Sequence, residues 1–202
     1  MELICESALI NDYLSELEAI DYSHAYIQQT LLQLHNANAN TLTKIQRAFE
    51  FVRDEIHHSV DIQSPRVTYK ASEVIQYKEG LCYAKSHALA ALLRAQSIPT
   101  GFCYQRLLNG TTPADGYSLH GLNAIYLEDE ARWIRLDARG NKPGVQSEFS
   151  IHEERLAFSV DPQQGEIDYP TIYAKPHPVI IHTLTTHTDC LHLCQYSLPA
   201  AL

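Results

Sequence analysis

The spacing of hydrophobic residues predicts helices in the first part of the chain. Within 11–35, and again within 41–58, apolar side chains recur at steps of three and four, and the polar run 35–40 separates the two stretches. The residues that carry this repeat are Leu14, Leu17, Ile20, Ile27, Leu31 and Leu34 in the first stretch, and Leu42, Ile45, Phe49, Val52 and Ile56 in the second. Because this period places apolar side chains on one face of a helix, we expect each helix to bury that face.

A further helical stretch, 82–97, is apolar on nearly every side and consists largely of Ala and Leu. A helix of this kind is typical of the centre of a domain. Pro99 and Gly101 follow it and are expected to end it. Upstream, Ser72 precedes a short apolar run, which predicts a capped short helix that ends at Gly80.

Beyond Gly101 the pattern changes from helical to extended. We predict strands at 102–107, 119–127 and 132–138, with a loop at 109–116 and an acidic turn at 128–130. Helices followed by antiparallel strands indicate an α+β fold. The remainder of the chain is punctuated by Pro and Gly, and its pattern predicts a short helix at 152–157 and a late strand at 179–184.

Composition narrows the class of protein. The chain has 202 residues, of which 45% are hydrophobic, so it can form a single domain with its own core. Its net charge of -9, without a cluster of basic residues, argues against nucleic acid or an anionic membrane surface as a partner. The N-terminus does not resemble a signal peptide and no long apolar span is present, so we expect a cytoplasmic protein with five free cysteines. The oligomeric state stays open.

Cys82 has the position of a nucleophile. It lies at the first turn of the predicted buried helix, where unpaired backbone amides and the helix dipole favour an anion such as a thiolate. The amides of Cys82 and Tyr83 would also face an oxyanion formed beside the sulfur. Taken alone, a cysteine at this position is more often a small buried core residue.

His120 and Asp137 supply the partners that a nucleophilic cysteine needs. His120 opens one predicted strand and Asp137 closes the next, and a tight turn joins the two strands. In an antiparallel hairpin these two residues point to the same face, opposed or one step apart, so their side chains can form a hydrogen bond. Asp137 would then orient the imidazole, whose other nitrogen would take a proton from Cys82.

Three motifs in this order resemble those of bacterial transglutaminase-like proteins. The motifs are EGLCYAKSHALAALLRAQSIP from Glu79, HGLNAIY from His120 and WIRLDAR from Trp133, and the resemblance covers about residues 60–142. It implies a papain-like cysteine-protease core with a triad in the order Cys, His, Asp. We therefore expect one domain over 1–202, with a helical part at 1–58, a catalytic core at 60–142 and a C-terminal extension at 143–202.

The chain departs from the family pattern at three positions. Leu122 stands where the family commonly has an aromatic residue, and Ala138 and Arg139 stand where it commonly has a Pro and a small polar residue. Since Cys82, His120 and Asp137 themselves are present, these departures bear on substrate choice rather than on the chemistry.

Other polar residues are secondary candidates. Gln63, upstream of the nucleophile, could be a second oxyanion donor together with the Tyr83 amide, although a Gln at such a position is more often an exposed loop residue. Arg139 and Asn141 could line the substrate cleft, where an Arg would suit a carboxylate-bearing group; solvation at a strand end is the alternative. His87 follows Cys82 by five residues, about 140° around the helix, and is interpreted as structural.

The expected reaction needs no metal or organic cofactor. A cluster of His182, His187, Cys190, His192 and Cys194 lies near the C-terminus, but its spacing matches no closed zinc module. We predict a cysteine-dependent acyl-transfer enzyme that acts on a peptide or amide through a thioester, with hydrolysis as the first choice. The alternatives are acyl transfer to an amine, as in protein cross-linking or acetylation, a catalytically silent interaction module of the same fold, and a metal-binding protein.

Overall fold

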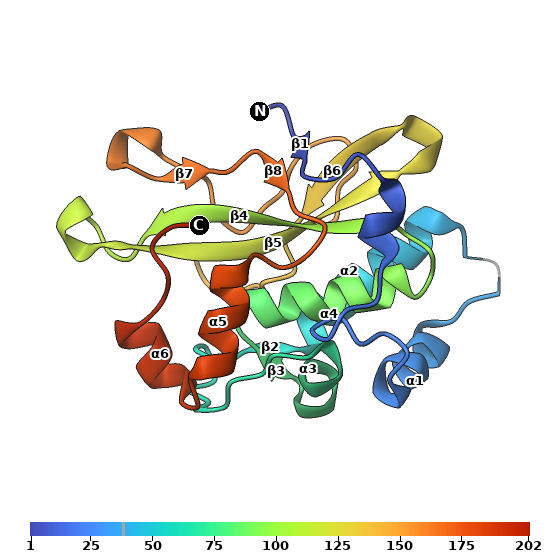
Figure 1. Cartoon of the computed structure of the whole chain (residues 1–202), viewed down its shortest axis with the longest axis horizontal. Helices are drawn as coiled ribbons and strands as arrows, with labels where there is room; N and C mark the ends of the chain where they lie inside the picture. Colours follow the sequence, from blue (N-terminus) through green and yellow to red (C-terminus); the bar gives the residue numbers. More distant parts are fainter. Residues whose placement is uncertain (38) are drawn as a thin grey trace.

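A four-stranded antiparallel sheet forms one layer of the molecule (Figure 1). The computed structural model describes residues 1–37 and 39–202. The sheet has the order β6-β5-β4-β7. Its strands are β4 (Thr100–Leu108), β5 (Tyr117–Leu127), β6 (Arg132–Leu136) and the short β7 (Ile167–Asp168). The expected three central strands and the α+β class are therefore confirmed.

Helices form the second layer, below the sheet in Figure 1. The central helix α4 (Cys82–Arg94) packs against β5, and all 13 of its residues are buried, as its apolar sequence indicates. Three helices pack against it: α1 (Ala25–Leu34), α2 (Thr41–Glu55) and α3 (Ala71–Tyr77). The core of the protein thus lies between α4 and the sheet, and α4 is held on all sides.

A short parallel pair of strands ties the end of α2 to the start of α4. β2 (His57–His58) pairs with β3 (Glu79–Gly80), in a register that sets His58 opposite Gly80. The N–H of Ser59 continues the pairing by donating to the carbonyl of Gly80 at 3.2 Å. Because Gly80 lies two residues before Cys82, this pairing fixes the chain after α2 beside the first turn of α4.

The N-terminal segment is less helical than its hydrophobic spacing predicts. The stretch 11–35 contains only the 3-10 helix η1 (Ile10–Leu14) and helix α1, with a turn closed by Leu17 and Ile20 between them. Strand β1 (Ile4–Cys5) pairs with β8 (Thr171–Ile172), so the first residues of the chain lie beside a segment from the last third of the sequence.

Among the residues that the structure describes, no helix is long and apolar enough to cross a membrane.

The C-terminal predictions at 152–157 and 179–184 were wrong. Residues 152–157 form bends, and 179–184 belong to helix α5 (Pro178–Thr186). The β-branched residues there favoured a strand. However, Pro178 suits the first helical turn, the His177 ring accepts a hydrogen bond from the Val179 N–H, and the buried residues Ile180, Thr183 and Leu184 follow helical spacing.

The last helix is α6 (Cys190–Tyr196), in a part of the chain for which the pattern predicted no element. The carboxylate of Asp189 caps it by accepting from the N–H groups of Leu191 and His192. The cysteines 190 and 194 are thus one helical turn apart, with their sulfurs 4.0 Å from each other. Helices α5 and α6 lie beside the Cys82 end of α4 (Figure 1).

Candidate active site

Cys82 is the first residue of α4 and is 9% exposed. Leu81 occupies the cap position in an extended conformation and provides no side-chain cap. The first N–H groups of a helix have no acceptor within the helix, and the helix dipole adds positive potential there. The sulfur therefore lies where an anion is stabilised, with the first-turn amides beside it.

His120 and Asp137 meet across the β5–β6 hairpin. The register pairs Asn123 with Leu136, so continuing it past the end of β6 places Asp137 one same-face step from His120. The two side chains are hydrogen-bonded, with His120 Nε2 2.8 Å from Asp137 Oδ2, and both residues are buried. The Cys82 thiol lines the same cleft, near enough to the imidazole to favour its charged form. Since Nε2 faces Asp137, Nδ1 is the nitrogen left to serve the thiol.

The electrostatic environment favours a charged His120. Burial acts against the imidazolium, but the charge of Asp137, the neighbouring Cys82 and the hydrogen bond to Asp137 outweigh it and raise the pKa of His120 to about 10. Burial also acts against the charged form of Asp137, which by itself would raise the pKa of this carboxyl group. The imidazolium of His120 and the hydrogen bonds that the carboxylate accepts reverse this effect, so the pKa of Asp137 lies below its ordinary value.

Backbone groups hold the Asp137 carboxylate in place. The N–H of Arg139 donates to Oδ1 at 3.1 Å, and the N–H of Ala157 donates to Oδ2 at 3.0 Å. The next residue, Phe158, packs edge-on against the His120 ring, with the centroids 4.9 Å apart. The C-terminal extension thus completes this site. The sequence gives only a weak signal for these contacts of the C-terminal extension, namely an aromatic residue within a polar segment.

Cys82 and His120 line one cleft of about 430 Å³. Most of its other lining residues come from four segments: His58 and Val60 after α2, Leu107 to Asn109 and Ser118 to Leu119 at the loop end of the β4–β5 hairpin, Phe158 and Ser159, and Cys194 with Leu198 at the C-terminus. The sequence analysis did not single out His58 or the C-terminal residues as lining a cleft. The walls are mainly apolar around a polar centre.

Arg139 lines the cleft, and Asp61 engages its guanidinium. Nη1 and Nη2 both donate to the Asp61 carboxylate, the second at 3.0 Å, and Lys142 Nζ lies 2.6 Å from the same group. Burial acts to raise the pKa of Asp61, but the hydrogen bonds from Arg139 and Lys142 lower it to about 2. The positive charge of Arg139 in the cleft wall is therefore balanced by the Asp61 carboxylate.

The structure does not bring Gln63 or Asn141 to the cleft. Gln63 is exposed in a left-handed conformation, φ +53°, and its amide nitrogen donates to the carbonyl of Val60 at 2.7 Å. Asn141 instead fastens a loop, because its side-chain oxygen accepts from the N–H of Ser147 at 2.8 Å. In both residues the polar side-chain atoms bond locally, away from Cys82.

Tyr83 and His87 have largely structural side chains. Tyr83 lines the cleft, but its buried hydroxyl donates to the carbonyl of Leu119, so the expected oxyanion role rests on its backbone amide alone. His87 is buried, with Nδ1 2.8 Å from the carbonyl oxygen of Tyr69. In the part of the chain that the structure describes, no group of three or more His, Cys, Asp or Glu side chains could hold a metal ion.

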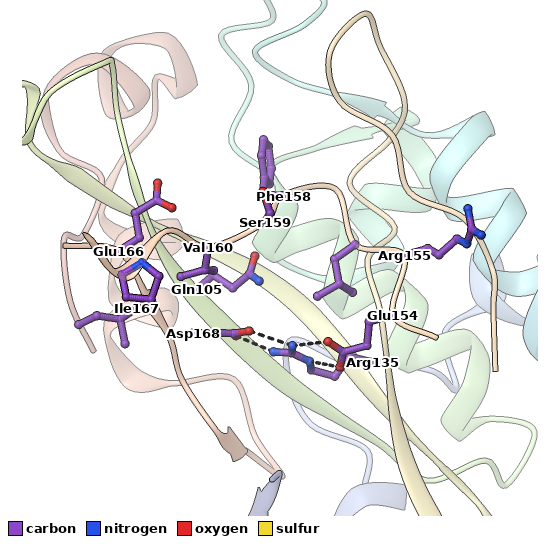
Figure 2. Close-up of a pocket in the computed structure, with 12 residues that line it drawn as sticks. Gln105, Arg135, Glu154, Arg155, Phe158, Ser159, Val160, Glu166, Ile167 and Asp168 are labelled. Carbon is purple, nitrogen blue, oxygen red and sulfur yellow. Dashed lines mark hydrogen bonds and ion pairs between the residues drawn. The ribbon is translucent and has the colours of Figure 1, made fainter. Parts of the chain in front are cut away.

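A second cavity, of about 640 Å³, adjoins the cleft and is shown in Figure 2. Phe158, Ser159 and Glu166 line both spaces, so the Phe158 segment forms a shared wall. On the floor of the second cavity Arg135 lies between Asp168 and Glu154, with hydrogen bonds of 2.6 to 2.9 Å to the two carboxylates (Figure 2). These ion pairs anchor the C-terminal extension to β6.

Comparison with known proteins agrees with this arrangement. The crystal structure of a "putative cysteine protease" from Cytophaga hutchinsonii superimposes with a TM-score of 0.52 at 19% identity, over 66% of this chain and 43% of that one. The chain thus spans less than half of that protein, and the likeness shows a shared fold. No curated protein matches the sequence.

The match to a family is more extensive. A sequence model described as the transglutaminase-like superfamily matches residues 28–138, which is more than half of the chain and includes Cys82, His120 and Asp137. The family and the shared fold support a cysteine-dependent enzyme at the level of the superfamily. The chain belongs to the transglutaminase-like superfamily.

Proposed function

We propose that this protein hydrolyses an amide or peptide bond through a thioester on Cys82. The observation that carries the proposal is the position of the His120 imidazole, which hydrogen-bonds to Asp137 at 2.8 Å and lines the same cleft as the Cys82 thiol. A nucleophile, a base and a group that orients the base are the parts of a thiol-dependent acyl-transfer site.

The geometry supports the following sequence of steps. The thiolate of Cys82 attacks the carbonyl carbon, and the carbonyl electron pair moves to oxygen. When the tetrahedral species collapses, the C–N bond breaks and the His120 imidazolium gives its proton to the leaving amine. Water, deprotonated by His120, then attacks the thioester and releases a carboxylic acid. Asp137 keeps the imidazole in one orientation throughout.

The cleft suggests a substrate with an apolar acyl group. Leu81, Leu107, Leu108, Leu119 and Leu198 contribute apolar surface beside Cys82. Arg139 was expected to suit a carboxylate, but Asp61 already engages its guanidinium through two hydrogen bonds. We therefore favour an uncharged acyl group over an acidic one.

The test is acylation of the intact chain with a p-nitrophenyl ester and with peptide amides, followed by mass spectrometry. We expect one acyl group per chain on Cys82, and none after Cys82→Ala. Cys5→Ser is the matched control, because Cys5 is exposed and lies outside the cleft. Acylation shared equally with Cys5, or retained after Cys82→Ala, contradicts the proposal.

The same assay separates water from an amine as acyl acceptor. Glycinamide is added at increasing concentration, and the free acid and the new amide are measured. If the free acid stays the main product at millimolar amine, the enzyme is a hydrolase. A product that becomes mostly amide assigns it to amine transfer instead.

A further inference from the structure

His58 lies in the catalytic cleft but has no role in the triad. It lines the same cleft as Cys82 and His120, and its pairing with Gly80 places it beside the segment that leads into Cys82. It approaches from the side of α2 and β2, whereas His120 comes from the sheet. The reacting carbonyl of a substrate bound to Cys82 would therefore have one imidazole on each side.

The hydrogen-bonding capacity of the His58 ring is not used within the described part of the chain. Nδ1 is buried and has no partner there, and no described residue forms a hydrogen bond with Nε2. Buried polar side-chain atoms normally have a partner. The residue as a whole is only half-buried, so the accessible part of His58 lies away from Nδ1, which points to Nε2 as the nitrogen that faces the cleft.

His58 is also held in its neutral form. Burial lowers its pKa to about 3, and the positive charges of Arg139, Lys85 and His120 act in the same direction, while Asp61 opposes them. A neutral imidazole carries one N–H and one lone pair. With the proton on Nε2, the ring presents an uncharged donor to the cleft and leaves only the lone pair of Nδ1 in the buried, unpartnered position.

We propose that His58 supplies the side-chain donor of the oxyanion hole, through Nε2–H, in place of Gln63. This inference rests on the proposed function. When the thiolate forms its bond to the carbonyl carbon, the negative charge that develops on oxygen is bound by Nε2–H of His58 and by the backbone N–H of Cys82. The His58 proton stays on nitrogen through both half-reactions, and the proton for the leaving amine comes from His120.

The experiment compares two reactions of the same thiol. Acylation by a p-nitrophenyl ester passes through an oxyanion, whereas alkylation by iodoacetamide displaces iodide at a saturated carbon and forms none. Loss of one oxyanion donor typically costs about 10²- to 10³-fold in rate. We expect His58→Phe, which retains a ring without an N–H, to slow acylation by about that factor and to change alkylation of Cys82 by less than about threefold.

Two further variants complete the design. His58→Gln keeps an N–H donor and should recover at least about tenfold of the acylation rate lost in His58→Phe. His57→Ala is the matched control, since His57 is the exposed neighbour in the same strand and does not line the cleft. Circular dichroism accompanies each variant.

The outcomes separate this inference from the proposed function. If acylation and alkylation slow equally in His58→Phe, or if acylation is unchanged, His58 is not an oxyanion donor. If His58→Gln recovers nothing, the effect of His58 is one of packing and the inference also fails. If the wild-type chain is alkylated at Cys82 but never acylated, the proposed function fails before His58 is tested.

Discussion

Phe158 packs edge-on against the His120 imidazole, with the two ring centroids 4.9 Å apart. Its neighbour Ala157 donates a backbone hydrogen bond to the carboxylate that orients the same imidazole. One short segment of the C-terminal extension therefore contacts both members of the His–Asp pair. It limits how far the ring can turn and keeps water from the buried hydrogen bond.

We predict that Phe158→Ala slows acylation of Cys82 by about tenfold, because the His120 ring loses the wall that restricts its orientation. Phe158 is half-buried, so the free energy of unfolding should fall by about 1–2 kcal/mol, less than for a fully buried Phe. Single-turnover acylation and urea unfolding measure the two effects. Phe158→Leu serves as control and should retain most of both. A Phe158→Ala variant that acylates at the wild-type rate shows that the ring is held by Asp137 alone.

Loss of Asp137 should have a smaller effect than loss of Cys82. Cys82→Ala removes the proposed nucleophile beside His120, so turnover should stop. Asp137→Ala leaves thiol and imidazole in place but frees the ring, and we expect a loss of roughly 10- to 10³-fold, below the ~10⁴-fold of a serine triad, because a thiol depends less on its base. Asp137→Asn should lie between wild type and Asp137→Ala. The measurement is acylation from pH 6 to 9 on variants whose folding is checked by circular dichroism.

The protonation of His120 makes stability dependent on pH. Its pKa is about 10 in the folded chain and about 6.5 when unfolded, so the stabilisation is fully present below about pH 6.5 and is lost as pH rises toward 10. We expect the free energy of unfolding to decline over that window, and His120→Gln to reduce the decline. Urea titrations at closely spaced pH values test this. Equal slopes in the two proteins would mean that His120 is neutral in the folded state.

The ion pair beneath the cleft should be important for stability. Asp61→Asn leaves the Arg139 guanidinium, which is 7% exposed, without its counter-ion. Removing one partner of a fully buried pair costs about 3–5 kcal/mol; since Asp61 is 25% exposed, we expect about 1–3 kcal/mol here. Lys142→Ala removes an exposed partner of the same carboxylate and should cost under about 1 kcal/mol. Urea unfolding of both variants checks the order, and a larger loss in Lys142→Ala would contradict it.

The parts that sequence predicts well are those whose signals are local. The apolar helix that begins at Cys82 and the hairpin that carries His120 are specified by periodicity and turn residues within each segment. The role of His58 depends on a register between β2 and β3, two short strands about 20 residues apart in sequence, which no local pattern specifies. Gln63 has the side-chain chemistry of an oxyanion donor, but it lies in an exposed turn with a left-handed backbone conformation, as its alternative interpretation expects.

The C-terminal extension was hardest to predict for a related reason. The β-branched residues around Ile180 favour a strand when read alone, whereas Pro178 and the His177 cap begin a helix whose buried face fits the core beside α4. The contacts of Ala157 and Phe158 with the His–Asp pair join residues 20 or more positions apart. Such contacts are determined by the packed structure and leave little trace in composition.

The hydrogen bond from Ala157 to Asp137 has a consequence for biosynthesis. A ribosome releases Cys82, His120 and Asp137 before it releases residue 157, so the three reactive side chains emerge while one donor of the orienting carboxylate is still missing. A nascent chain at that stage holds a thiol whose imidazole partner is loosely aligned. Under the proposed function, we expect full reactivity only after the segment around Ala157 has docked, which would restrict acylation of Cys82 during synthesis.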